Sequence, residues 1–108
     1  MADFSTWYHG TTRERARSIV RDGLNARDYG SGLYGLGATY HVLARNLHQA
    51  TAWAQPGTGT GAIVTVHVPD DERAEYLTCP DGRCYCGGVL SGLVKPLPPR
   101  MVRSSEHV

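Results

Sequence analysis

The chain has 108 residues, a formal net charge of +1 and 41% hydrophobic residues. A chain of this length is expected to form one small domain, residues 1–108, that buries roughly 60–65% of its unfolded surface. The composition excludes a strong nucleic-acid or membrane signal: the charge is nearly balanced, and no apolar run reaches the ~18 residues of a membrane-spanning helix. Because the N-terminus lacks a secretory signal and the cysteines are odd in number, we expect a cytoplasmic protein.

The first residues of the chain predict a strand followed by a helix. The short apolar run over residues 7–9, directly before Gly10, is typical of a strand end. Thr11 stands three residues before Glu14, which is the spacing of a capping box, and Gly23 is a natural stop for the helix. The apolar face of this helix is expected to comprise Ala16, Ile19 and Val20.

A second helix is predicted in the middle of the chain. A glycine-rich loop over residues 25–37 leads to a short expected strand over residues 38–42, and the helix is expected over residues 43–54. A flexible connector over residues 55–61 follows. The apolar residues of the helix fall on one stripe, which comprises Leu43, Leu47, Ala50 and Ala54.

The second half of the chain predicts short strands. Further strands are expected over residues 76–78, 89–94 and 101–102, with a frayed tail over residues 104–108. Helices early and strands late predict an α+β fold with a mostly antiparallel sheet. The clearest strand is the β-branched run over residues 62–68, which places Val64, Val66 and Val68 on one face and Ile63, Thr65 and His67 on the other.

The segment over residues 7–54 concentrates groups that suit a flat, polar small molecule. His9 and Gly10 stand at the predicted strand end, and Tyr34 and Tyr40 lie within and after the glycine cluster. Glycine lets a backbone approach a ligand closely, a tyrosine ring offers a platform with a polar tip, and a neutral histidine can donate to a hydroxyl. These residues therefore predict a small-molecule pocket.

Four motifs in this segment resemble the ADP-ribosyltransferase superfamily, in the branch of diphtheria toxin and the poly(ADP-ribose) polymerases. They are Tyr-His-Gly-Thr over residues 8–11, the helix end over residues 19–24, the Gly-Leu-Gly of residues 35–37 before a tyrosine, and the alanine-bearing helix. The tail over residues 94–102 is similar to the family's closing segment. The resemblance implies an ADP-ribosyltransferase-like split β-sandwich of mostly antiparallel strands with two short helices, which binds NAD as a substrate between two small sheets.

The resemblance also implies roles for individual residues in a mono-ADP-ribosyltransferase or NAD-cleaving enzyme whose acceptor is unknown. His9 would bind a ribose hydroxyl. Gly10, with Thr11 beside it, would hold the nicotinamide carboxamide through its backbone N–H and C=O. Tyr40 or Tyr34 would stack on the nicotinamide ring. Tyr34 fits the literal spacing of the motif, whereas Tyr40 is preferred because it leads into the expected strand and helix.

The family's catalytic glutamate has no counterpart in this chain. Its place falls near Ser91, and no Asp or Glu lies between Asp81 and Glu106. Serine can donate or accept a hydrogen bond but cannot act as a base at neutral pH. Asp81 is a substitute candidate. The gap favours an alternative: the same pocket put to use in a non-transferase biosynthetic enzyme or a ligand-binding module. An RNA 2′-phosphotransferase is a further hypothesis.

The three cysteines raise the question of a structural zinc site. Cys79, Cys84 and Cys86 have an uneven spacing, and His67 or His41 would have to supply the fourth ligand. Free thiols are the favoured interpretation, and the resemblance requires no metal. A zinc-stabilised interaction module stays open as a hypothesis.

Overall fold

The computed structural model describes residues 3–24, 42–54, 59–77, 90–93 and 95–108. These residues form an α+β structure of antiparallel strands and short helices, as the sequence predicts. In chain order the elements are β1 (Phe4–Thr12), α1 (Arg13–Asp22), β2 (Val42–Ala44), α2 (Leu47–Trp53), β3 (Gly61–Pro69), a 3-10 turn (Asp70–Glu72), α3 (Arg73–Tyr76), β4 (Leu90–Gly92), a second 3-10 turn (Pro99–Met101) and β5 (Val102–His107).

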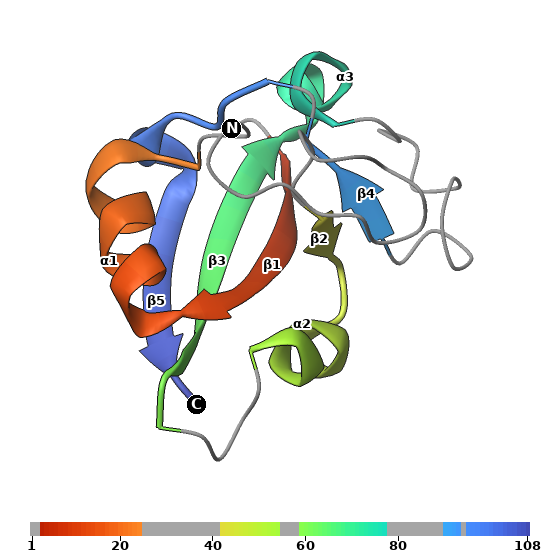
Figure 1. Cartoon of the computed structure of the whole chain (residues 1–108). Helices are drawn as coiled ribbons and strands as arrows, with labels where there is room; N and C mark the ends of the chain where they lie inside the picture. The colour runs from red at the N-terminus through yellow and green to blue at the C-terminus, as the bar shows by residue number, and fades with distance from the viewer. Residues whose placement is uncertain (1–2, 25–41, 55–58, 78–89, 94) are drawn as a thin grey trace.

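The five strands form one antiparallel sheet in the order β4-β2-β1-β3-β5 (Figure 1). The first strand of the chain is therefore the central strand of the sheet. It pairs with β3 along its whole length, from Phe4 opposite Pro69 to Thr12 opposite Gly61. Among the described strands β4 and β5 lie at the edges, and the last strand of the chain pairs with β3.

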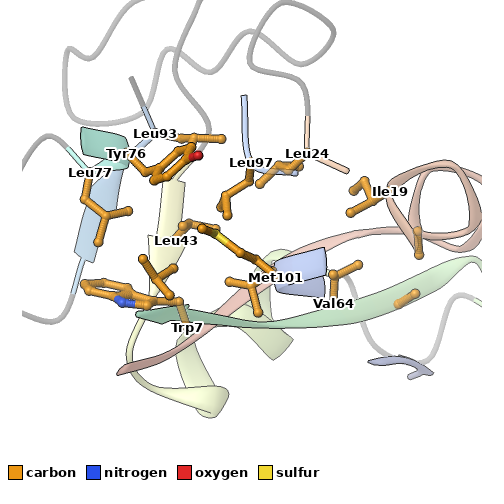
Figure 2. Packing of buried hydrophobic residues seen from close by; sticks show 14 residues of the cluster. Trp7, Ile19, Leu24, Leu43, Val64, Tyr76, Leu77, Leu93, Leu97 and Met101 are labelled. Carbon is orange, nitrogen blue, oxygen red and sulfur yellow. The ribbon is translucent and has the colours of Figure 1, made fainter. Parts of the chain in front are cut away.

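One face of the sheet carries the main hydrophobic core. Strand side chains alternate between faces, and the burial of β1 and β3 follows this alternation, with Trp7 opposite Val66 in the register. The predicted division of β3 is confirmed on this face. The α1 helix, the second 3-10 turn and α3 supply the covering side chains, as Figure 2 shows; the labelled residues are Trp7, Ile19, Leu24, Leu43, Val64, Tyr76, Leu77, Leu93, Leu97 and Met101.

The opposite face of the sheet is covered only in part. A small second cluster joins β2, α2 and β3 through Ala44, Ala50, Ala54 and Ile63. Tyr8 of β1 is half-buried against it. Farther along β1 and β3 the same face carries polar and aromatic side chains that keep part of their exposure, among them Thr6, Thr65 and His67.

The first helix begins one residue later than the sequence predicts. Thr11 is still part of β1, where it pairs with Ala62, so its backbone is extended and Thr12 caps the helix instead. The Thr12 hydroxyl accepts a hydrogen bond from the backbone N–H of Arg15 at 3.2 Å. The predicted stop at Gly23 is confirmed by its φ of +86°, a left-handed conformation that favours glycine. Val20, expected on the apolar face, is 45% exposed.

The second helix is shorter than predicted, because a strand occupies its expected first residues. Leu43 and Ala44 belong to β2 and are fully buried, and the helix starts only at Leu47. Asn46 is its N-cap, with its side-chain oxygen accepting from the N–H of His48 at 2.8 Å. Leu47 is therefore not part of the buried stripe and is 49% exposed.

Two predictions for the second half of the chain are wrong. Of the expected strand over residues 76–78, Tyr76 is instead the last residue of α3 and Leu77 makes a single bridge to Leu93, while residue 78 lies outside the described residues. The expected frayed tail is β5, whose residues pair with β3 from Val102 opposite Val66 to His107 opposite Ala62. The predicted strand over residues 89–94 is confirmed in its centre, as β4.

Candidate functional site

His9 lies in the central strand of the sheet and is almost fully buried. It stands opposite Val64 of β3 and is 9% exposed. By the alternation of β1 it shares its face with Trp7, the face that α1 and the core cover. A side chain that is buried to this extent is fixed in one conformation by the residues packed around it. A residue that positions a ligand needs a fixed conformation of this kind.

Gly10 is the point at which α2 touches the central strand. A Cβ atom built on Gly10 would lie 2.1 Å from the carbonyl oxygen of Ala50 and 2.9 Å from the backbone nitrogen of Ala54. These are backbone atoms that no rotamer change can move aside. The structure therefore gives Gly10 a packing reason to be glycine, in addition to the backbone clamp that the sequence suggests.

The exit of β1 is held to the start of β3 by Arg13. Its backbone N–H donates to the carbonyl oxygen of Thr60 at 2.8 Å, and its side-chain Nε donates to the carbonyl oxygen of Gly61 at 3.3 Å. Thr11 is half-buried just before this point. The segment that carries His9, Gly10 and Thr11 is thus held in place by β3 and α2.

The strand that contains Ser91 lies two strands away from His9. Leu43 of β2 pairs with Ser91 of β4. Tyr8 pairs with Ala44 and Ala44 pairs with Leu90, so these three residues form one row across β1, β2 and β4. His9 and Ser91 each follow a residue of that row, and the same register continued by one residue places their backbones level, at about twice the ~4.8 Å strand spacing.

The stacking tyrosines and the metal candidates lie outside the described residues. This applies to Tyr34, Tyr40 and the three cysteines, Cys79, Cys84 and Cys86, and equally to His41 and Asp81. Their predicted roles stay predictions. Within the part of the chain that the structure describes, no group of three or more His, Cys, Asp or Glu side chains could hold a metal ion.

A second group of side chains was not predicted from the sequence. Phe4 of β1 stacks on His67 of β3, with ring centroids 4.1 Å apart and an interplanar angle of 18°. Arg103 of β5 lies beside them in a shallow pocket of about 370 Å³. Partial burial and the charge of Arg103 hold the pKa of His67 below its usual value. The alternation of β3 predicted the face of His67, but Phe4 and Arg103 carried no signal in the sequence.

No protein-family model matches this chain, and no curated protein matches it either. The class of protein that can be stated from the fold is a small α+β domain built on a five-stranded antiparallel sheet. Among the described residues there is no helix with the length and apolar character needed to cross a membrane.

Proposed function

We propose that this domain binds NAD beside His9 and Gly10 and is a mono-ADP-ribosyltransferase or NAD-cleaving enzyme. The proposal includes the finer fold expectation, a split β-sandwich in which a second small sheet closes the NAD cleft. It rests on the sequence resemblance together with the positions that the antiparallel sheet gives to the matching residues.

The observation that carries the proposal is the row that His9 shares with Ser91. His9 and Ser91 are far apart in the chain, and nothing in the sequence around either residue requires the two to lie opposite each other across the sheet. The resemblance implies that the ribose-binding histidine and the residue at the catalytic glutamate position act on the same ribose. The two backbones would lie ~10 Å apart, on either side of Leu43, and a ribose bound by both residues would lie over Leu43.

In this proposal the protein binds and orients the dinucleotide. His9 donates to a ribose hydroxyl, and the backbone of Gly10 holds the nicotinamide carboxamide while a tyrosine covers the ring. Cleavage of the nicotinamide–ribose bond passes through an oxocarbenium-like state, so orientation of the two halves of NAD and stabilisation of the developing charge supply the rate. Water or an acceptor nucleophile then attacks the ribose carbon as nicotinamide departs with the bonding electrons.

The serine at position 91 favours a second candidate, a pocket that binds its ligand without transferring ADP-ribose. Glu106 is the first acidic residue after Ser91 in the chain, but it cannot replace the family's missing catalytic glutamate. It lies in β5 opposite Ile63, in the row of Gly10 and beyond β3, whereas Ser91 lies beyond β2 on the other side of the central strand. The acidic residue that the structure places nearest to β4 is Glu75 of α3, and it is ion-paired with Lys95.

Release of nicotinamide from NAD separates these two candidates. We expect the wild-type protein to release nicotinamide and His9→Gln to release it at least about tenfold more slowly, because the glutamine amide does not place its N–H where the imidazole N–H lies and one hydrogen bond to a charged transition state is lost. The matched control is His48→Gln, which removes an exposed histidine on α2 and should leave the rate unchanged. Release that is equal in all three proteins, or absent from the wild type, contradicts the transferase; absence together with tight NAD binding supports the second candidate.

A further inference from the structure

We propose that the pocket around Phe4, His67 and Arg103 binds a nucleotide, with the base stacked on Phe4 and the phosphate on Arg103. This site is separate from the proposed NAD site. Phe4 and His9 are five residues apart on one strand, which is roughly 16 Å, and their positions in β1 have opposite parity, so they belong to opposite faces. The inference does not depend on whether NAD binds beside His9.

The stacked pair supplies an aromatic platform with an open side. Phe4 follows Asp3 at the start of β1 and is 52% exposed, although His67 covers one face of its ring. Among the described residues, only Phe4, Val20 and Leu47 are large hydrophobic side chains that are exposed to solvent. A planar base laid on the uncovered face would extend the stack, and base–aromatic stacking is worth about 1–3 kcal/mol per base.

A β-bulge brings the cation to this platform. Thr65 pairs with Ser104 but the next residue of β3, Val66, pairs with Val102, so Arg103 is an extra residue in β5. Bulges re-aim a side chain at the edge of a sheet, and here Arg103 lines the same pocket as Phe4 and His67. None of the ion pairs among the described residues involves Arg103.

Two of the charged side chains near the pocket are held in ion pairs, while Asp3, next to Phe4 in the chain, carries an exposed carboxylate. Arg100 lines the pocket, but it is paired with Glu72 at 2.8 Å. Asp70 is paired with Arg73 at 3.3 Å. The unpaired Arg103 is therefore the charge available to an anion, and a single phosphate fits it better than a long polyanion does. The pocket volume of about 370 Å³ lies at the small end of ligand sites.

The nucleotide can be free or can be the terminal unit of a single strand, and the two sources share the same chemistry. We would titrate the ¹⁵N-labelled protein with adenosine monophosphate and, separately, with a 3′-phosphorylated tetranucleotide. We expect amide shift changes at Phe4, His67 and Arg103 with at least one probe. Changes with adenosine monophosphate identify a free nucleotide, and changes with the tetranucleotide alone identify a strand end.

Two variants test the assignment, and two further variants serve as controls. Phe4→Leu keeps an apolar side chain but loses the ring, and Arg103→Gln loses the charge; each is expected to weaken binding about tenfold. Arg21→Gln is the matched control, because it changes the net charge equally at an exposed site on α1. His9→Gln should leave these shifts intact, which separates this site from the NAD site. No shift with either probe, or an equal effect of Arg21→Gln and Arg103→Gln, would overturn the proposal.

Discussion

Replacing Gly10 with alanine is expected to destabilise the protein by about 3 kcal/mol, the upper end of the range of 1–3 kcal/mol that is typical of overpacking, because the clash is with backbone atoms. The new methyl group would lie 2.1 Å from the carbonyl oxygen of Ala50. Relief requires α2 to move away from β1, which would open the small cluster around Ala50 and Ile63. In a domain of this size the midpoint of thermal unfolding should fall by roughly 10–20 °C, as followed by circular dichroism.

Gly59→Ala is the control for this experiment. Gly59 has a φ of +78° but nothing within 4 Å of its Cβ position, so alanine there pays only the backbone strain of about 1–2 kcal/mol. The structure predicts that Gly10→Ala is clearly the less stable of the two. If Gly10→Ala is as stable as Gly59→Ala, then α2 does not pack against the central strand as described, and the glycine would be explained by ligand binding alone.

Restoring a carboxylate at position 91 is expected to raise the rate of nicotinamide release at least about tenfold, since a positioned acid or base contributes 10²–10⁴-fold. The reason is the place of Ser91 in the sheet, level with His9 and paired with Leu43. The variant is Ser91→Glu. The measurement is the initial rate of nicotinamide release from NAD under saturating conditions.

Ser91→Gln is the matched variant, because glutamine has the size and hydrogen-bonding capacity of glutamate without its charge. A gain with Ser91→Glu alone supports a transferase site that lacks its acid. Equal rates in the two folded variants would show that position 91 does not face the ribose, and would favour the pocket that binds without transferring.

The elements that could be predicted are those whose local sequence pattern is enough to determine their secondary structure. The β-branched alternation of β3 predicted both its bounds, to within one residue at each end, and its faces, and Gly23 predicted the end of α1. The start of α2 was wrong because Leu43 fits a helical stripe as well as it fits a strand. Pairing with Ser91 in β4 and with the central strand decides in favour of the strand.

Only the first residue of β5, Val102, was predicted as strand, because the residues after it resemble a polar tail. Five of its six residues, from Arg103 to His107, are polar and exposed, and they become a strand only because β3 offers a partner. Dependence on strand pairing also explains which residues of the candidate sites could be predicted from the sequence and which could not. His9 and Gly10 were found from a local motif, whereas the approach of Arg103 to Phe4 follows from a bulge that only the paired sheet can show.

The central claim is that NAD binds beside His9, and calorimetric titration of NAD into the purified protein tests it most directly. We predict saturable binding by the wild-type protein and by His48→Gln, and binding weakened at least about tenfold in folded His9→Gln, because the glutamine amide does not place its N–H where the imidazole N–H lies and the hydrogen bond to the ribose is lost. Circular dichroism would establish that the variants are folded. An absence of binding heat at millimolar NAD, or equal affinity in all three proteins, would contradict the account.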